Sequence, residues 1–243
     1  MMRVAKFIAS SGLCSRRNAE KLIAEGRVKV GGRAIASPAL DVKGGDKIEV
    51  DGKMVKPQQS RIFAYYKPAG LVVSHSDEKG RESVFDRLPK GLLSVGRLDL
   101  MSEGLLLLTT SGDVQRALEK GAFERVYRVR VHGHPTMEVL APAMKGMTVD
   151  GMHYRPMKIE IKSQGNSNAW LEVAITEGKN RELRKVFEAL GFPIVRLIRV
   201  SYAGIVLGDL RPGKLREEKP PSMEVFLLPG RLGRDGATEI GIS

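Results

Sequence analysis

The sequence predicts an α+β fold in two modules. A small basic module of two helices and short strands (ααβ) precedes a larger module built on a mixed, largely antiparallel sheet with flanking helices. Three observations predict this fold. Positive charge is concentrated at one end, the apolar spacing switches between helical and alternating, and no series of strand–helix–strand units indicates a parallel sheet.

The charge is distributed unevenly along the 243 residues. Residues 1–60 hold 12 Lys+Arg and 6 Asp+Glu, whereas residues 61–243 hold 28 and 22, so each part contributes +6 to the net charge of +12. A quarter of the chain therefore carries half of the excess charge, which indicates a polyanionic partner, either nucleic acid or an acidic membrane face. The polar, proline-containing stretch that follows Lys56 is typical of a linker, so we expect a first domain at residues 1–56 and a linker at 57–61.

Within the first module, apolar residues at helical spacing predict a helix that begins near Val4 and ends at residues 10–12. Ser15 is a suitable N-cap for a second helix, which ends at Gly26. Apolar and charged residues then alternate at residues 28–30, as in a half-buried strand.

The second module is expected to extend over residues 62–229. Alternating or continuous apolar runs predict strands, and longer amphipathic stretches predict helices. The strands are expected at residues 62–66, 105–110, 126–131, 157–161, 170–176 and 194–200, and the helices at 112–120 and 181–190. Residues 230–243 are rich in glycine and charge, which predicts a flexible tail.

Composition excludes several classes of function. The single cysteine, Cys14, permits neither an internal disulfide framework nor a cysteine metal site; we expect it to be a packed small residue in a protein of a reducing compartment. The longest apolar run, residues 105–108, is too short for a membrane span, so we expect a cytoplasmic protein that does not bind membranes. His132 and His134 lack a third ligand nearby, so we expect no metal. Phosphate-loop and nucleophile-elbow motifs are absent, which leaves carboxylate chemistry beside arginines.

Basic residues of the first module fall near one exposed face. They are Arg16, Arg17 and Lys21 of the second expected helix, followed by Arg27 and Lys29. A solvated charged face is one interpretation, and a phosphate-binding surface is the other. The order of residues over 15–23 and 26–32 closely resembles the S4 RNA-binding domain, and the resemblance covers about residues 2–50. It implies a surface that holds structured RNA, but it does not identify a reaction.

A second motif lies at residues 96–99, which read Gly-Arg-Leu-Asp, between an apolar stretch and a buried strand. Loops in such places hold working groups on a rigid scaffold. An ordinary contact between Arg97 and Asp99 is the structural alternative.

This run, with Ser102 and the following Gly-Leu, closely matches a motif of the RsuA family of pseudouridine synthases. Further segments resemble the family's motifs in the family's order, over about residues 62–215. They are residues 65–70 (Lys-Pro-x-Gly), 125–129 (Lys-x-Tyr-x-Val, with Arg125 in place of Lys), 177–187 (the helix entry), and 197–200 with 203–204 (the closing segment). An S4 domain before the catalytic domain is the arrangement seen in that family.

The resemblance implies three catalytic residues. Asp99 matches the catalytic aspartate, which either attacks the sugar of the target uridine or assists departure of the base. Tyr127 matches a tyrosine that stacks on the uracil and is a candidate for removing the carbon-bound proton; a core tyrosine is the alternative. Arg184 matches the basic partner of the aspartate, and a bidentate contact would fix the orientation of the carboxylate.

The resemblance also implies substrate-binding residues. Arg97 matches a residue that fills the space left by the extracted base. Leu183 and Ile198 are expected to line the uracil pocket, with core packing as an equal alternative. Neither a cofactor nor a metal is implied.

Residues 179–182 look more like the family members that modify large-subunit ribosomal RNA. We therefore expect a protein that acts on ribosomal RNA or on a ribosomal subunit assembly intermediate. We expect it to be a monomer. A small-subunit or tRNA pseudouridine synthase is an alternative. A non-catalytic S4 protein would be expected to lack the aspartate or its partners, and a carboxylate-dependent glycosidase would need a second carboxylate, for which Glu103 is the nearest candidate.

Overall fold

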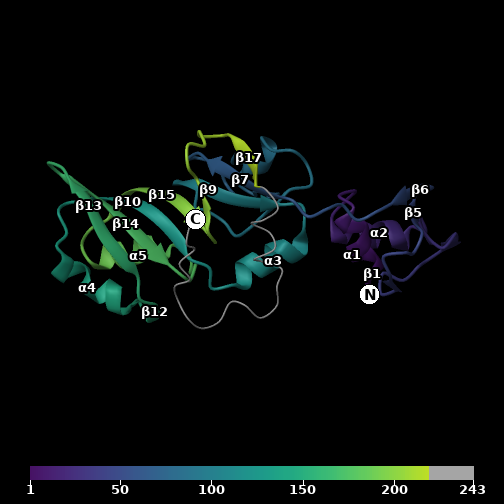
Figure 1. The fold of residues 1–243 in the computed structure, drawn as a ribbon, viewed down its shortest axis with the longest axis horizontal. Coiled ribbons are helices and arrows are strands. Elements are labelled where there is room, and N and C mark those ends of the chain that lie inside the picture. The colour runs from purple at the N-terminus through teal and green to yellow at the C-terminus, as the bar shows by residue number, and fades with distance from the viewer. Residues whose placement is uncertain (219–243) are drawn as a thin grey trace, which may run out of the picture.

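The computed structural model describes residues 1–218, in which an N-terminal module and a larger sheet module are joined by residues 56–61 (Figure 1). The predicted tail at 230–243, and residues 219–229 of the expected second domain, lie outside the described residues. No helix of the described part is long and apolar enough to cross a membrane.

The N-terminal module has two helices on small sheets, as predicted. Its helices are α1 (Val4–Ser10) and α2 (Arg16–Ala24), and its strands are β1 (Met2–Arg3), β2 (Val28–Val30), β3 (Arg33–Ala34), β4 (Asp41–Val42), β5 (Ile48–Val50) and β6 (Lys53–Val55). The side chain of Ser15 accepts a hydrogen bond from the N–H of Asn18 at 3.2 Å, which confirms the predicted N-cap. Phe7, Ile8 and Ile23 form the core, and Cys14 packs against it.

The larger module is built on one nine-stranded sheet. Its strands are β7 (Ile62–Lys67), β8 (Leu93–Ser94), β9 (Ser102–Thr109), β10 (Arg125–His132), β13 (Lys158–Gln164), β14 (Asn168–Ile175), β15 (Ile194–Tyr202), β16 (Ile205–Val206) and β17 (Leu215–Glu218). The main order is β13-β14-β10-β15-β9-β7-β17. The central pair β9–β15 is parallel and the other pairs are antiparallel, which confirms the predicted mixed sheet.

Both faces of this sheet are covered. Leu106 and Leu108 of β9 join the core that includes α4 (Met137–Lys145) and α5 (Glu182–Ala189), whereas Leu105 and Leu107 join the core that includes α3 (Gly112–Lys120). Burial on both faces explains why β9 has a continuous apolar run instead of an alternating one. In Figure 1, α4 and α5 lie at the end of the sheet formed by β10 and β13–β15, and α3 lies on the side nearer the N-terminal module.

Gly104 permits the close approach of the two parallel strands. It pairs with Arg199 of β15 and has a φ of +96°. A Cβ at this position would lie 2.3 Å from the carbonyl oxygen of Arg199, which no side chain tolerates without movement of the backbone. Because β9 begins directly after the Asp99 loop, this contact fixes where that loop ends.

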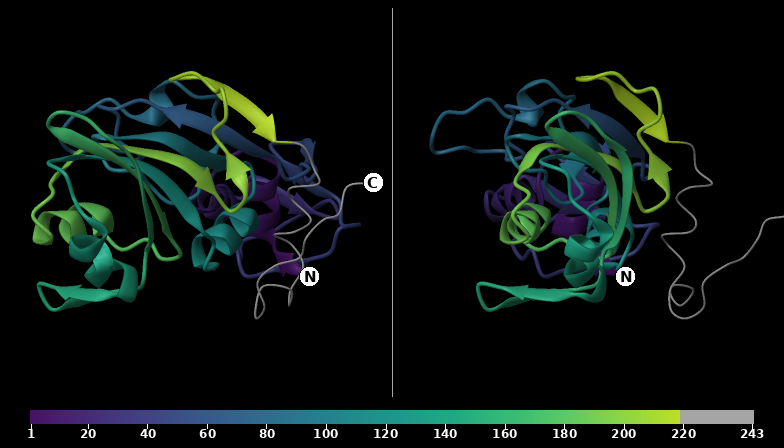
Figure 2. Two further views of the ribbon diagram at one scale, coloured as in Figure 1. Left: turned by 60° about the vertical axis from the view of Figure 1, so that its left-hand side comes forward. Right: turned by 90° about the vertical axis from the view of Figure 1, so that its left-hand side faces the viewer.

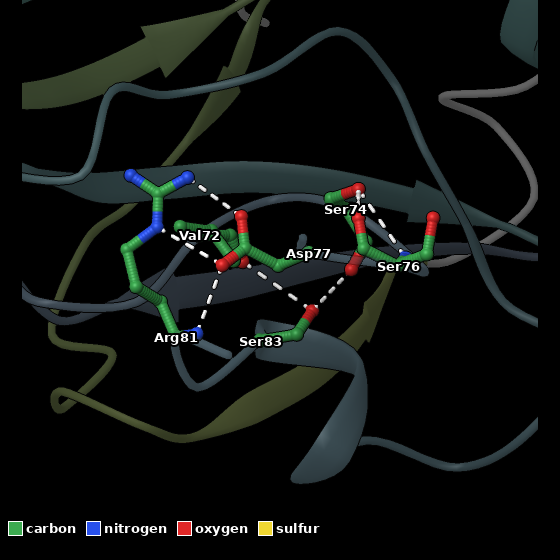
Figure 3. A network of polar contacts seen from close by, with 6 residues as sticks. All are labelled: Val72, Ser74, Ser76, Asp77, Arg81 and Ser83. Atoms are coloured by element: carbon green, nitrogen blue, oxygen red, sulfur yellow. Dashed lines mark hydrogen bonds and ion pairs between the residues drawn. The ribbon is translucent and has the colours of Figure 1, made fainter. Parts of the chain in front are cut away.

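The connection between β7 and β8 is a long loop with its own polar contacts (Figure 3). The guanidinium of Arg81 donates to both carboxylate oxygens of Asp77, at 3.0 and 2.6 Å. The hydroxyl of Ser83 donates to the carbonyl of Ser74 and caps the short 3-10 helix η1 (Val84–Asp86). These contacts order an exposed segment that lacks regular pairing of its own.

Several elements of the larger module were not predicted from the sequence. They are α4, η1, the hairpin of β11 (Met147–Val149) and β12 (Met152–Tyr154), and the strands β8, β16 and β17. Pro142 inside α4 obscures its helical pattern, although the structure accommodates it in the helix. β17 pairs with β7, from which it is separated by about 150 residues in sequence, and Figure 2 shows the two strands side by side at one edge of the sheet.

The helix α1 of the N-terminal module contacts both the sheet module and the connecting segment at residues 56–61. The ammonium of Lys6 in α1 lies 2.7 Å from the carboxylate of Asp113 in α3. The N–H of Gln58 donates to the carbonyl of Ser10 at 3.0 Å, so the connecting segment follows the end of α1. Both ion-pair partners are substantially exposed, so this pair contributes little stability by itself. That residues 57–61 are a linker between two domains remains a prediction.

Candidate active site

A pocket of about 290 Å3 lies in the larger module, and four segments supply most of its lining. The segments are the loop at residues 96–99, β10, β15, and the loop and helix at residues 178–184. The lining is rich in arginine, with Asp99, Glu119 and Glu182 as the carboxylates. The pocket brings together residues as far apart in the sequence as Gly96 and Tyr202.

Asp99 lies in a loop whose backbone carbonyls accept hydrogen bonds from a buried lysine. The ammonium of Lys67, which is fully buried, donates to the carbonyls of Pro68, Leu100 and Ser102 at 3.0, 3.1 and 2.8 Å. The N–H of Ser102 closes the turn on the carbonyl of Asp99 at 3.0 Å. Burial lowers the pKa of Lys67 to about 8. The lysine of the Lys-Pro-x-Gly segment therefore fixes the backbone on both sides of Met101.

Two arginines face the carboxylate of Asp99. Arg184 Nε lies 3.9 Å, and Arg181 Nη1 lies 4.0 Å, from Asp99 Oδ2. At these distances the two contacts are ion pairs and not hydrogen bonds. The expected bidentate contact from Arg184 is therefore wrong for this structure, because its Nη1 donates instead to the carbonyl of Ile194 at 3.3 Å. Arg181 was not predicted to face the aspartate.

The walls beside Asp99 are aromatic and apolar. Tyr127 of β10, Leu183 of α5 and Leu197 of β15 line the pocket, and the tyrosine is 7% exposed. Ile198 was expected here, but it is not among the lining residues. Side chains alternate along a strand, so Ile198 points to the opposite face of the sheet, where it packs in the core with Val114. Leu197 takes the place expected for Ile198.

Two further arginines of the lining surround the ring of Tyr202. The guanidinium carbons of Arg125 and Arg199 lie 4.5 and 5.1 Å from the ring centroid. Arg125 also donates to the hydroxyl of Tyr202 at 3.0 Å, and Arg199 donates through Nε to the carbonyl of Leu105 at 2.7 Å. The described part of the chain gives neither arginine a carboxylate partner. Arg125 therefore keeps a positive charge at the pocket where the family motif has lysine.

The pocket also concentrates polar atoms that lack partners. Among the described residues, six side-chain nitrogen or oxygen atoms are buried without a hydrogen bond, and four of them belong to lining residues. The four are Ser102 Oγ, Glu182 Oε1, Arg184 Nε and Arg199 Nη2. Unsatisfied buried groups are costly, and their concentration in one cavity is typical of a site that is completed by a substrate or a proton.

Arg97, the last lining residue predicted from the sequence, is exposed at the mouth of the pocket. Within residues 1–218 its guanidinium has no ion-pair partner, so it is free to contact a ligand. Of the predicted catalytic and substrate-binding residues, the structure therefore brings Asp99, Tyr127, Arg184, Arg97 and Leu183 together and places Ile198 elsewhere.

The basic residues of the N-terminal module are exposed, as predicted, but they are not equivalent. Arg17, Lys21 and Lys29 have no ion pair in the described structure, whereas Arg16 lies 4.0 Å from Glu20. Arg27 is neutralised by Asp51, to which it donates at 2.8 and 2.7 Å, and by Glu25. Arg27 is therefore the weakest phosphate ligand among the five predicted residues.

Residues 1–218 contain no group of three His, Cys, Asp or Glu side chains that could hold a metal ion. His134 contacts the carbonyl of Gly165. Glu103, the second carboxylate that a glycosidase would need, is bound by Arg196 at 2.8 and 2.9 Å and does not line the pocket. The geometry therefore places Asp99, and not Glu103, in the pocket beside cations.

The fold and the pocket define a class of protein: an α+β enzyme with a cationic pocket large enough for a nucleoside, preceded by a small basic module. Comparisons with known proteins identify the family. The family described as RNA pseudouridylate synthase matches residues 61–189, and the S4 domain matches residues 2–48. The chain belongs to the RNA pseudouridylate synthase family and is a pseudouridine synthase with an N-terminal S4 domain.

Relatives and a solved structure agree with this assignment. A protein of Rickettsia prowazekii (strain Madrid E) named as an uncharacterized RNA pseudouridine synthase is 46% identical, over 89% of this chain and 94% of that protein. The protein of Bacillus subtilis (strain 168) named ribosomal large subunit pseudouridine synthase B is 36% identical, over 90% and 93%. A crystal structure of a pseudouridylate synthase superposes with a TM-score of 0.65 at 25% identity, over 93% of this chain and all of that chain.

Proposed function

We propose that this enzyme isomerises a specific uridine of large-subunit ribosomal RNA, and that Asp99 is its essential carboxylate. The choice of RNA is supported by relatives in Bacillus subtilis, Haemophilus influenzae and Salmonella typhi that are named ribosomal large subunit pseudouridine synthase B and are 36–38% identical. The resemblance at residues 179–182 favours the same choice over small-subunit RNA or tRNA.

The observation that carries the proposal is the placement of Asp99. Its carboxylate lies between two cations, Arg181 and Arg184, and beside the walls formed by Tyr127 and Leu183. This arrangement sets two cations beside the carboxylate, next to a surface that suits a flat uracil ring. A carboxylate so placed serves either as a nucleophile at the sugar carbon C1′ or as a stabiliser of positive charge there.

The other lining residues then have defined roles. Once the bond between C1′ and N1 of uracil is broken, the base turns in the pocket and rejoins C1′ through C5, and the hydrogen on C5 is lost. In this proposal Tyr127 stacks on the base and is the candidate for assisting the removal of that proton, while Leu183 limits how the ring moves. Arg97, exposed and free at the mouth, fills the space that the extracted nucleotide leaves in the RNA.

Residues 1–56 supply the surface that holds the RNA. Arg16, Arg17, Lys21 and Lys29 are exposed on the N-terminal module, and each phosphate that they neutralise releases a counterion. We infer that the enzyme works in the cytoplasm as a monomer, on free ribosomal RNA or on an assembling subunit, without a metal or cofactor.

The test is a map of pseudouridines in ribosomal RNA from cells that lack this protein. We expect one large-subunit uridine to lose its modification, and we expect a plasmid-borne wild-type copy to restore it while an Asp99→Asn copy does not. Loss only in small-subunit RNA or tRNA would overturn the choice of substrate, and restoration by Asp99→Asn would overturn the role of the aspartate.

A further inference from the structure

A buried carboxyl group other than Asp99 lies in this pocket, and the chemistry outlined above does not use it. Glu182, the first residue of α5, is only 3% exposed and lines the pocket that contains Asp99. Its Oε2 accepts a hydrogen bond from the N–H of Lys179 at 2.9 Å, but its Oε1 is buried without a partner in the described structure. A charged carboxylate in such a place is costly unless it is paired or neutralised.

Glu177 is an acidic neighbour of Glu182, and its negative charge acts on the Glu182 carboxyl. Glu177 is already engaged as an acceptor. The N–H of Arg155 donates to its Oε1 at 2.6 Å, and the ammonium of Lys179 lies 2.9 Å from its Oε2. Two ionised carboxylates repel each other, whereas a proton on Glu182, donated toward Glu177, removes the repulsion and gives the free oxygen of Glu182 a partner.

We propose that Glu182 is a positioning residue of this active site: with a proton on its carboxyl it joins Glu177 to the amide of Lys179, and so holds Arg181 against Asp99. The inference rests on the proposed role of Asp99. It adds a group that acts through the loop at residues 177–181 and does not touch the substrate.

The geometry of the loop shows how Glu182 acts on Arg181. The N–H of Glu182 donates to the carbonyl of Lys179 at 3.2 Å while its carboxyl receives the N–H of Lys179, so two hydrogen bonds close the turn that contains Arg181. Arg181 has a φ of +51°, a left-handed conformation that a non-glycine residue adopts only when its surroundings impose it. The helix α5 has no side-chain N-cap at Arg181 that could hold this turn instead.

The same loop is anchored to the hairpin of β11 and β12. The ammonium of Lys179 donates to the carbonyl of His153 and lies 5.6 Å from the ring centroid of Tyr154. Glu177 reaches Arg155, directly after β12. The proton between Glu177 and Glu182 therefore connects this anchor to the turn, and the turn carries the guanidinium that lies 4.0 Å from Asp99.

The charges around the pair favour a proton on Glu182 and not on Glu177. Burial raises the pKa of Glu182 to about 7; the Lys179 amide opposes this shift, and the negative charge of Glu177 adds to it. Burial alone would raise the pKa of Glu177 too, but the N–H of Arg155 and the ammonium of Lys179 lower it. Other charged groups also line the pocket. They are Arg97, Asp99, Glu119, Arg125 and Arg199 from other segments, and Arg181 and Arg184 from its own.

The test is the dependence of pseudouridine formation on pH, measured from pH 5.5 to 8.5 with the full-length protein and an RNA substrate. Because the carboxyl pair shares its proton, the titration belongs to the pair. We expect kcat of the wild type to fall as the pH rises through about 7, with little change in KM, because the loss of the proton releases Arg181 and not the RNA.

Two substitutions distinguish the effect of the proton on Glu182 from the effect of the size of its side chain. In Glu182→Gln the amide donates to Glu177 and accepts from Lys179 at every pH. We therefore expect kcat at pH 6 within about threefold of the wild type, and no alkaline fall. Glu182→Ala loses both contacts, and we expect a kcat at least about tenfold lower at every pH. Glu188→Gln, on the exposed side of the same helix, is the matched control and is expected to keep the wild-type profile.

Three outcomes would overturn the proposal: a Glu182→Gln profile that superposes on the wild type, a Glu182→Gln variant as inactive as Glu182→Ala at pH 6, or a Glu182→Ala variant as active as the wild type. Asp99→Asn, assayed alongside, separates this inference from the proposed function. If Asp99→Asn retains activity, the proposed function fails; if it is inactive while Glu182→Gln behaves as the wild type, only the role of Glu182 fails.

Discussion

Five of the six residues predicted to act at the active site line one pocket, because they were identified from sequence motifs. Asp99, Arg97, Tyr127, Arg184 and Leu183 belong to motifs whose order and spacing are visible in the sequence. Ile198 was misplaced because a strand puts successive side chains on opposite faces, and the motif does not say which face is buried against the site.

Other residues of the pocket could not be predicted from the sequence. Arg181, Glu182 and Arg199 are charged residues in a strongly charged chain, and nothing in their spacing distinguishes a buried charge from a solvated one. The burial of Glu182 and Arg199 arises from tertiary contacts between β9, β15 and the loop before α5, whereas Arg181 is exposed. A buried titratable group is thus a finding of the structure even where the motif that contains it is predicted.

Arg184→Lys tests how the aspartate is oriented. A lysine keeps the charge but cannot contact both Asp99 and the carbonyl of Ile194, as the guanidinium does. We expect kcat to fall by about 10- to 100-fold with RNA affinity retained, because charge-assisted contacts contribute about 1.5–3 kcal/mol. Arg116→Lys, an exposed pair with Asp113 on α3, is the control. An Arg184→Lys enzyme with wild-type kcat would contradict the orienting role.

The carboxyl of Glu182 also predicts how stability depends on pH. Its pKa is raised by folding from 4.5 to about 7, so the folded state binds the proton more tightly than the unfolded state does. The stabilisation is complete below pH 4.5 and is lost as the pH rises through about 7. Denaturant unfolding of the wild type and of Glu182→Gln should therefore show the wild type losing on the order of 2 kcal/mol relative to the variant over this range. A constant difference between the two would refute the shift.

At the scale of elements, helices and strands with periodic apolar spacing were predicted well. Short strands that depend on pairing with distant parts of the chain were not. The helix α3 and the strands β7, β10 and β14 follow from apolar spacing, to within one or two residues at their ends. The hairpin of β11 and β12 and the edge strand β17 are short, and their pairing depends on partners that local sequence does not specify. Likewise, Gly104 is the only sign in the sequence of the parallel contact between β9 and β15, and the sequence alone does not say why a glycine stands there.

Gly104→Ala tests that contact. The added Cβ would lie 2.3 Å from the carbonyl oxygen of Arg199, so the two strands must separate, and we expect a loss of unfolding free energy of about 3 kcal/mol or more together with lower activity. Gly151→Ala is the matched control. It also has a positive φ, +74°, but its Cβ would have no atom within 4 Å, so it reports the cost of the backbone conformation alone, about 1 kcal/mol. Equal losses in the two variants would show that the close approach is unimportant.

At the scale of the whole molecule, we expect the division of charge along the chain to separate the binding of RNA from the chemistry. The exposed cations of α2 and β2 lie on the N-terminal module, whereas the pocket lies in the sheet module. Figure 1 shows the two modules side by side along the longest axis, with α3 of the sheet module facing the N-terminal one. An RNA that contacts both must therefore follow the surface from α2 toward the pocket.

A triple substitution of Arg17, Lys21 and Lys29 to alanine measures the contribution of the N-terminal module. Each lost phosphate contact reduces the slope of log affinity against log salt by about 0.7–0.9, so we expect a slope smaller by about 2–3 and weaker binding at low salt. The control removes three cations that are already paired, Arg87, Lys158 and Lys162. The same change of slope in both triple variants would show that only net charge matters.

The most direct test of the account is the loss of hydrogen from uridine C5 in ribosomal RNA labelled at that position, measured with the wild type and with Asp99→Asn. We expect release by the wild type and a rate at least about 10³-fold lower for Asp99→Asn, with RNA binding and thermal unfolding unchanged. Release by Asp99→Asn at a rate near that of the wild type would contradict it, because the carboxylate between Arg181 and Arg184 would then not be the group that breaks the glycosidic bond.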